Sequence, residues 1–572
     1  MTDTKTDNTK IAKPWLKRKR VWGIVILILL VYFCLVPSRT RISPETTGIT
    51  GPLTADGRVD YFAAFEKLYI DKLSPPEDNG QRYIIAAFGP RVLEQNALAD
   101  SVPWEEMPTH EHSKNWFETR WIPLCEHLYI DPYERPMFYD SRSLYGYMRK
   151  IEEQQKADVG EKDFEYDSGD YQKLFDALVK APWTAEDYPI PAQWVKEYSP
   201  VLDYFGQCVR MPNYACYRWP SGSLIAILLP DVQATREFAR SLQVRINERV
   251  GRGDLEGAWY DVMSMKHIAV HYRDEPVLVT CLVGIAIDGI ANASTQQILT
   301  HGNPTQEQLE RFLQDLNDLS QPNSFSLSMT LERTAAYETL RFFKEGHGKE
   351  FYGVYEQYGD DNQKRSLRMM RYLALLPIDA NIAGERLTEL FGEFGLRDFS
   401  DFHQGSNPVL QRQYAEQMEE KLEQLQKKLQ KTSQWSRVPL IRTRSQLLAE
   451  YIFVQHTPAL TNVIKAFSRD KAHNEMLRIA IALEHYKKVN GEYPAKLDVL
   501  VPTYFPMVPL DPFTGRKTIT YKITPDGKHP FVLYSYGPNT KDDNGRSEDE
   551  AGKTGGNDYI NHDIVFWFEW NE

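Results

Sequence analysis

The 572-residue chain, with 42% hydrophobic and 26% charged residues, has the composition of an ordinary globular protein and is long enough for about two to four domains. Its net charge of −12 at pH 7 predicts no broad basic face, which argues against nucleic acid as a partner.

The N-terminal 37 residues predict a membrane anchor. Residues 1–20 hold seven Lys or Arg against two Asp, and an uninterrupted apolar run occupies 21–37. Those 17 residues would extend roughly 25 Å as a helix, near the lower limit for crossing a bilayer. Positive charge before the run predicts a cytoplasmic tail, a single transmembrane span in a bacterial inner membrane, and an extracytoplasmic, periplasmic location for the remaining chain.

Two other interpretations of the apolar run stay open. A cleaved signal peptide needs small residues at its exit, and a lipoprotein signal needs a small residue before its cysteine. The exit at 33–39 offers neither, because Phe33 precedes Cys34. An uncleaved anchor is therefore the preferred interpretation.

A linker and a large helical region follow. Residues 38–57 are rich in Pro, Thr and Gly, and the pattern over 58–468 is mainly helical. Short turns with Gly or Pro join the clearest helices, the first of which Asp254 caps, so we expect an α-hairpin stack, solenoid-like but without a fixed repeat. These helices are predicted over 254–272, 277–299 and 304–319.

The segment 277–299 is apolar enough to suggest a second span. Asp288, Asn292 and Gln296 recur about one turn apart along it. A span would bury this polar stripe in lipid at a steep cost, so we predict a core helix with one polar edge.

A charged amphipathic helix is predicted over 409–430. Leu422, Leu425 and Leu429 share one face with Met418, and Glu423 can pair with Lys427 one turn later. The stripe is too short for a coiled coil, so we expect a single helix packed on the body.

Motifs for catalysis or metal binding are sparse. The sequence has no Gly-x-Ser-x-Gly elbow and no Walker loop. His267 and His271 share a helix face, and His110 and His112 lie together near His127, but neither pair has a recognisable full ligand set.

The region 100–220 carries the one enzymatic alternative. It holds many Trp, Tyr and Pro residues between short helices, and such loops often line carbohydrate or peptide sites. An extracytoplasmic hydrolase with its site in 100–220 is therefore the alternative hypothesis. Cys208 and Cys216 are close enough in sequence to bridge a loop there, and free thiols are the other possibility.

The last hundred residues, 469–572, predict a small α+β domain. Asn490-Gly491 supplies a helix stop, prolines keep the next stretch out of a helix, and apolar alternation bounded by turn residues predicts strands. One helix laid on an antiparallel sheet buries all these faces. The predicted elements are a helix over 476–489 and strands over 519–523, 531–536 and 564–568.

This ordered set of features resembles the globular domain of the major pseudopilin of type II secretion systems. The matching features are Tyr493-Pro494 after the helix, the turn at Asp511-Pro512-Phe513, the hairpin, the acidic Asp542-Asp543-Asn544-Gly545 segment, and Asp563 near the end. The whole layout is also similar to that of large membrane-anchored proteins of planctomycete-type bacteria that carry pseudopilin-like C-termini.

The resemblance implies a calcium ion in the acidic, Gly-rich segment 539–563. Ca²⁺ takes oxygen ligands from carboxylates, amides and carbonyls. By position, the candidates are Asn539, Asp542, Asp543, Asp558 and Asp563. The family commonly has Asp at the first of these positions, and an unliganded surface loop is the alternative.

The expected fold is thus mainly α, with an anchor, a helical body and a small pseudopilin-like α+β domain. We expect a membrane-anchored extracytoplasmic scaffold or interaction protein, associated with secretion or envelope machinery. More than 400 residues separate the predicted span from the module, which argues against polymerisation into a pseudopilus.

Overall fold

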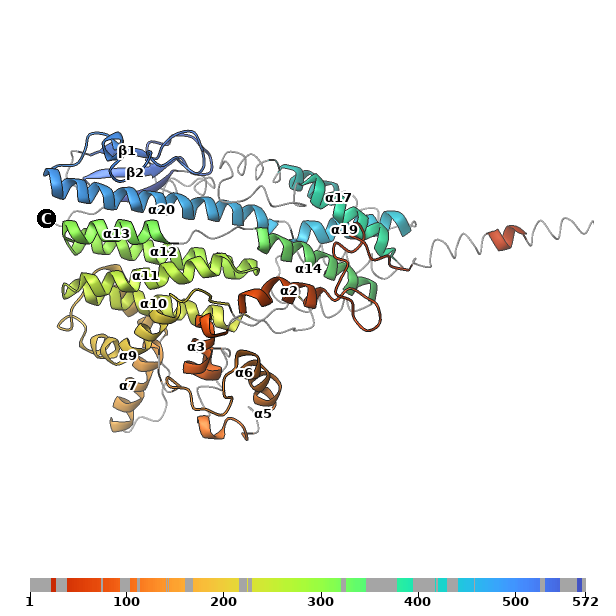
Figure 1. Cartoon of the computed structure of the whole chain (residues 1–572), viewed down its shortest axis with the longest axis horizontal. Coiled ribbons are helices and arrows are strands. Elements are labelled where there is room, and N and C mark those ends of the chain that lie inside the picture. Colours follow the sequence, from red (N-terminus) through yellow and green to blue (C-terminus); the bar gives the residue numbers. More distant parts are fainter. Residues whose placement is uncertain are drawn as a thin grey trace, which may run out of the picture. The chain divides into compact units, whose positions relative to one another are not determined.

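Helices dominate the part of the chain that the computed structural model describes, which confirms the prediction of a mainly α fold (Figure 1). Of the predicted span, residues 22–26 are helical, and the rest lies outside the described residues. The structure describes residues 22–26, 39–73, 76–92, 103–110, 114–139, 141, 143–159, 168–215, 224, 229–319, 326–345, 378–394, 417, 420–429, 441–456, 458–524, 530–545 and 563–567.

The regular elements are as follows. The longer helices are α2 (Tyr61–Leu73), α3 (Gly80–Phe88), α6 (Ile122–Leu128), α7 (Leu144–Val159), α8 (Ser168–Lys180), α9 (Pro189–Cys208), α10 (Pro230–Gly251), α11 (Leu255–Arg273), α12 (Leu278–His301), α13 (Gln306–Asp318), α14 (Ser326–Glu345), α17 (Ala380–Glu393), α19 (Ile441–His456) and α20 (Pro458–Asn490). Shorter turns are η1 (Pro76–Asp78), η2 (Gly89–Val92), η3 (Trp104–Glu106), α5 (Lys114–Trp116), η4 (Phe117–Trp121) and η7 (Leu497–Leu500). The strands are β1 (Thr520–Ile523), β2 (Phe531–Ser535) and β3 (Ile564–Trp567).

Two compact units make up the fold, and they divide the chain differently from the expected ranges 58–468 and 469–572. The larger unit comprises Phe62–Glu332, Asp398–Glu419 and Ala459–Glu572, and the smaller comprises Met1–Tyr61, Arg333–Arg397 and Glu420–Pro458. The C-terminal module falls in the larger unit because its helix shares a hydrophobic core with α9 to α13.

The larger unit stacks α10, α11, α12 and α13 beside α20, with the strands beyond α20 (Figure 1). Local signals set the helix starts. Asp254 accepts a hydrogen bond from the Gly257 amide at 2.9 Å and caps α11, as predicted. Thr305 and Gln308 form a capping box that begins α13.

The helix α12 is a core helix with a polar edge, as predicted. Among the described helices, α12 alone is long and apolar enough to cross a membrane, yet most of its apolar stretch is buried inside the protein. Asp288 and Asn292 are buried along its polar edge.

The helix α20 begins earlier than the predicted helix at 476–489. It starts at Pro458 and ends at Asn490, where Gly491 takes the left-handed conformation expected of a helix stop (φ +85°). The added turns bury Val463, Ile464 and Ala472, so burial supports the helix beyond the predicted start. Of the predicted apolar stripe, Val489 is exposed at the helix end.

The three strands form an antiparallel sheet in the order β1-β2-β3, close to the predicted ranges. Tyr521 pairs with Leu533 and Leu533 pairs with Phe566, so β2 lies in the centre. Phe531 and Leu533 share one hydrophobic cluster with Met476 and Ala480 of α20. The predicted arrangement of one helix on an antiparallel sheet is therefore present.

The smaller unit contains α17, α19, residues 333–345 of α14 and the segment 39–61. Residues 39–57, which were expected to be a linker, pack here against helices. Asn381 Oδ1 accepts a hydrogen bond from the Arg41 amide at 2.8 Å, and Asn381 Nδ2 donates to the Arg39 carbonyl at 3.0 Å. Thr46 of the same segment is buried. A Cβ at Gly384 would overlap the backbone oxygen of Thr46, so a glycine permits this close approach.

The helix predicted at 409–430 is present over 420–429. Leu422, Leu425 and Leu429 are buried, and Glu423 pairs with Lys427 at 2.6 Å, as predicted. Met418 lies outside the described residues.

Candidate calcium site in the C-terminal module

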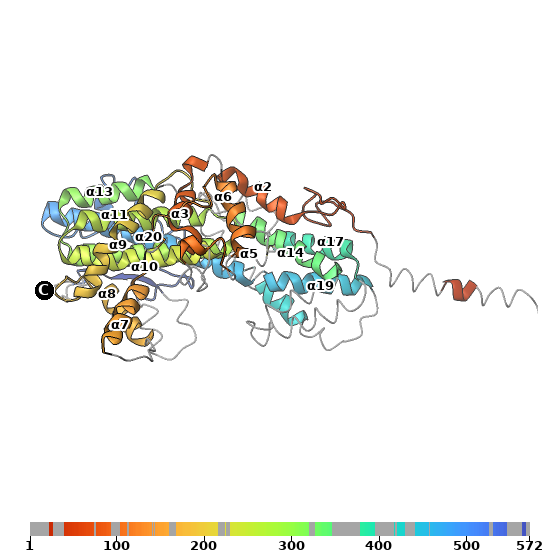
Figure 2. The same cartoon turned by 90° about the horizontal axis from the view of Figure 1, so that it is seen from below.

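The candidate site lies over β2, all five residues of which are buried. The sheet belongs to the larger unit, in which α20 lies with α10, α11 and α13 in the turned view as well (Figure 2). Phe531 and Leu533 belong to the core shared with α20. On the other face, Val532 and Tyr534 lie under the acidic segment, because a Cβ added to Gly545 would come within 3.5 Å and 3.3 Å of them, respectively. The start of the acidic segment therefore covers the outer face of the sheet.

Asp542 connects the start of the acidic segment to β2 through a hydrogen bond. The Tyr534 hydroxyl donates to Asp542 Oδ1 at 2.9 Å, and the Asn544 amide donates to the same oxygen at 2.9 Å. Asn544 and Gly545 both have left-handed backbone, with φ of 63° and 78°, which Asn and Gly tolerate best. The Asp-Asn-Gly sequence thus makes a tight turn that brings Asp542 onto the strand.

Asn539 and Asp543 lie at the entry to the same turn. Asn539 Oδ1 accepts from the Lys541 amide at 2.9 Å, and its Nδ2 donates to Asp543 Oδ2 at 2.7 Å. These bonds hold an amide and a carboxylate near Asp542 at the start of the acidic segment.

Asp563 is the buried member of the group. It directly precedes β3 and has no exposed surface. Its Oδ2 accepts from the Gly545 amide at 2.8 Å, whereas its buried Oδ1 has no hydrogen-bond partner among the described residues. Burial raises the pKa of Asp563 to about 6, and the charges of Asp543 and Asp542 add to this rise while backbone amides oppose it.

These residues fit calcium in donor chemistry. Each of the four described candidates offers at least one side-chain oxygen, and one buried oxygen of Asp563 has no hydrogen-bond partner in the described part of the chain. Asp558 lies outside the described residues. Within the described part, no three His, Cys, Asp or Glu side chains are yet arranged as a metal-ligand set.

Calcium at about 1 mM should raise the thermal stability of this module, because a ligand that binds only the folded state stabilises it. The folded pKa of Asp563, about 6, lies above that of an unfolded Asp at ~3.9. Ionising this carboxyl therefore disfavours folding increasingly as the pH rises from about 4 to 6. The calcium-induced rise in melting temperature of the full-length protein should thus be larger at pH 7 than at pH 5.

The variant Asp563→Asn should lose the calcium response and, at pH 7 in chelator, should melt higher than the parent protein. Asp498→Asn provides the matched control, since Asp498 is an exposed carboxylate of the same module. Equal calcium shifts in Asp563→Asn and the parent protein would show that the ion does not bind here.

Asp511 is a structural carboxylate whose long-range role the sequence did not indicate. Its Oδ1 accepts from the Phe513 and Thr514 amides at 3.0 and 2.8 Å, which makes the predicted turn. Its Oδ2 accepts from the Tyr536 amide at 2.9 Å, and the side chain is fully buried. The Asp-Pro signal identified the turn, but not the bond to the end of β2.

In the His267/His271 pair, His271 has contacts within the protein. His271 Nε2 lies 3.1 Å from the Val209 carbonyl oxygen, and the His271 ring stacks on Tyr214. Burial, with the nearby charges of Arg210 and His271, lowers the pKa of His267 to about 4. His112 lies outside the described residues, and nothing is described for the His127 side chain.

Four aromatic residues of the region 100–220 pack against one another. Trp104, Phe117, Trp121 and Tyr139 are buried in one hydrophobic cluster, with Trp104 in edge contact with Trp121 and Tyr139. Buried rings cannot contact a ligand, so this packing gives them a structural role.

The thiols of the described cysteines are free. Cys208 is buried, and burial raises its pKa to about 12, while Cys216 lies outside the described residues. Cys125 and Cys281 are also buried free thiols. For Cys208 the structure therefore agrees with the free-thiol alternative.

Comparison of the chain with protein-family models, with curated proteins and with solved structures found no match.

Proposed function

We propose that this protein is a membrane-anchored extracytoplasmic scaffold of a bacterial inner membrane, whose pseudopilin-like C-terminal module binds calcium and engages secretion or envelope proteins. The observation that supports this most is the order of features in the module. A long helix is backed by three antiparallel strands, and the start of an acidic segment follows β2 and lies over it. The resemblance implies this same order.

The N-terminal sequence supports the membrane part of the proposal. Seven basic residues in 1–20 precede the apolar run 21–37, and the positive-inside rule then directs the remaining chain out of the cytoplasm. A single span is sufficient to hold the protein at the membrane.

Fusion of the module to the helical body supports a scaffold role. The helix α20 belongs both to the sheet domain and to the core formed by α9–α13. Its polar residues also join a buried ionic cluster, because Arg273 of α11 contacts Asp470 at 2.5 Å. A module fixed in this way presents one defined surface, as a docking protein requires.

Three measurements on the full-length protein with a C-terminal tag test this proposal. Alkaline carbonate washing should leave the protein in the membrane, and protease added to spheroplasts should remove the tag. Crosslinking followed by purification from membranes should recover secretion or envelope components. A protease-protected tag in intact spheroplasts would contradict the topology, and recovery of cytoplasmic proteins only would contradict the partner class.

A further inference from the structure

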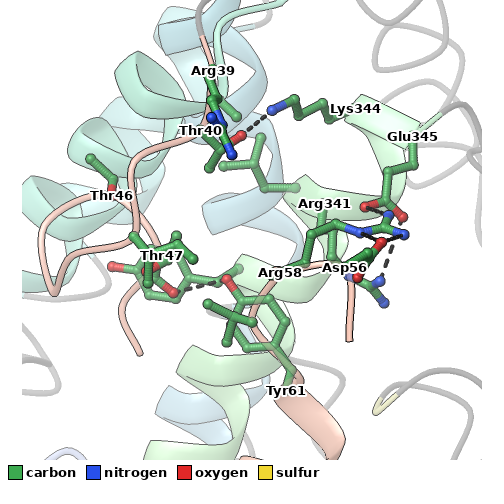
Figure 3. A pocket seen from close by; sticks show the side chains of 16 residues that line it. Arg39, Thr40, Thr46, Thr47, Asp56, Arg58, Tyr61, Arg341, Lys344 and Glu345 are labelled. Atoms are coloured by element: carbon green, nitrogen blue, oxygen red, sulfur yellow. Dashed lines mark hydrogen bonds and ion pairs between the residues drawn. The ribbon is translucent and has the colours of Figure 1, made fainter. Parts of the chain in front are cut away.

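The smaller unit contains a cavity of about 350 Å³, within the size range of small-molecule sites. Its walls come from the segment 39–61, from residues 337–345 of α14 and from the start of α17 at Ala380 (Figure 3). Hydrogen bonds fix these walls: Tyr61 donates from its hydroxyl to the Thr47 carbonyl at 2.9 Å, and Asn381 holds the backbone at both Arg39 and Arg41.

The charges lining this cavity are unequal. Four cationic side chains face it against two carboxylates, although the whole chain carries a net charge of −12. Arg58 forms ion pairs with both carboxylates, with Asp56 and, at 2.5 Å, with Glu345 (Figure 3). Arg341 lies 3.5 Å from Glu345 as well. The remaining cations of the lining are Arg39 and Lys344.

Lys344 and Arg39 lie together at one side of the cavity (Figure 3). Lys344 donates to the Thr40 hydroxyl, and neither Lys344 nor Arg39 forms an ion pair with any residue that the structure describes. Burial lowers the pKa of Lys344, while the charges of Asp379 and Glu345 oppose this. Asp379 is itself engaged, because it caps α17 through the Asn381 and Ile382 amides.

An apolar surface adjoins this cationic side. Ile42, Val59 and Leu340 line the same cavity, and the hydroxyl oxygens of Thr46 and Tyr61, which donate their hydrogens within the wall, can accept hydrogen bonds from a ligand. A lining of this kind suits a ligand with an anionic head and a short apolar or hydroxylated part.

We propose that this cavity binds an organic phosphate, with Lys344 and Arg39 contacting the phosphate and the apolar wall contacting the remainder. The phosphate can come from a phospholipid headgroup or from a soluble phosphate ester. The lipid source rests on the proposed function, because the predicted span ends at Pro37 and Arg39 would then lie at the membrane surface. The charge and shape of the cavity do not depend on the anchor.

The test uses full-length protein in an uncharged detergent. Titration calorimetry measures the binding of each of three probes. The probes are dioctanoyl phosphatidylglycerol, glycerol 3-phosphate, and glycerol as the neutral control. We expect at least one phosphate probe to bind and glycerol not to bind. Binding of the lipid alone would assign the source to the membrane, whereas equal binding of both phosphates would assign recognition to the phosphate ester itself.

Lys344→Gln should weaken phosphate binding by about tenfold or more, because a charge-assisted contact to phosphate is lost. Lys427→Gln is the matched control, because it makes the same substitution at an exposed side chain of the same unit, and this variant should bind as the parent protein does. Arg39→Gln removes an exposed side chain with little risk to folding and should also weaken binding.

Absence of binding by both phosphate probes at about 1 mM, or unchanged affinity in both Lys344→Gln and Arg39→Gln, would overturn the proposal. The topology measurement is separate. A protein that proves not to be anchored but binds glycerol 3-phosphate in a Lys344-dependent manner would keep this site and refute only the anchor.

Discussion

Replacing Lys266 by methionine should destabilise the larger unit by about 3–5 kcal/mol, because it removes one partner from a buried ion pair. Lys266 Nζ lies 3.0 Å from Asp288 Oδ1 and donates to Asn292 and Asn474 at 2.6 and 2.7 Å. Both charged side chains are almost fully buried. Without the lysine, Asp288 would keep, among the described residues, Arg273 as its one ion-pair partner, at 3.5 Å.

The cluster spans three helices, which explains the size of the expected effect. Lys266 and Arg273 come from α11, Asp288 from α12, and Asp470 and Asn474 from α20. Although burial opposes it, the charges of Lys266 and Arg273 lower the pKa of Asp288. Loss of Lys266 should therefore loosen the attachment of α20, and with it the C-terminal module, to the body.

Hydrogen exchange of amides in α11, α12 and α20 of the full-length protein measures this loss locally, which suits a chain with two compact units. Lys471→Met is the matched control: Lys471 is exposed on α20, and its replacement should change stability by no more than about 0.5 kcal/mol. The double variant Lys266→Met/Asp288→Leu removes both charges and should recover much of the loss. Equal protection in Lys266→Met and Lys471→Met would refute the role of the cluster.

The polar edge of α12 shows where prediction from sequence succeeds and where it stops. Spacing along 277–299 correctly placed Asp288 and Asn292 on one edge of a core helix. The spacing could not predict which helices pack against that edge. A periodic pattern shows which residues share a helix face, but it does not identify the residues that contact this face. Lys266 comes from 22 positions before Asp288 and Asn474 from 186 positions after it.

The missed start of α20 has the same origin. Arg469, Asp470 and Asn474 interrupt the apolar pattern before Met476, so the sequence indicated a helix only from there. In the structure Asp470 is buried because Arg273 pairs with it. Polar residues that face a partner in the core are indistinguishable in sequence from residues that face water.

The C-terminal strands were predicted closely because their signals are local. Apolar alternation and turn residues lie within the strands and loops themselves, and the observed strands at 520–523, 531–535 and 564–567 differ from the predictions by one residue at most at each end. In the candidate calcium site, the carboxylates were identified from the sequence. The burial of Asp563 could not be predicted from the sequence, because it depends on how Gly545 and its neighbours pack over β2.

Replacing Asp261 by asparagine should also cost about 3–5 kcal/mol, because two arginines lose their common buried carboxylate. Arg245 donates to both oxygens of Asp261, at 2.9 and 2.6 Å, and Arg249 donates to Oδ2 at 2.8 Å. The Arg245 and Asp261 side chains have no exposed surface. An amide of the same shape would leave both guanidinium groups without sufficient negative charge in a dry environment.

The variant Asp203→Asn tests whether the cost in stability comes from burial of the carboxylate or only from its contact with Arg245. Asp203 accepts from Arg245 Nη1 at 2.8 Å, yet its side chain is 47% exposed. Water can replace this carboxylate, so the identical substitution should cost less than about 1 kcal/mol. Hydrogen exchange in α10 and α11 would measure both variants under one set of conditions. Similar losses would mean that contact with Arg245, and not desolvation around Asp261, determines the energy, whereas a several-fold difference would identify the buried carboxylate as the group that holds α10 against α11.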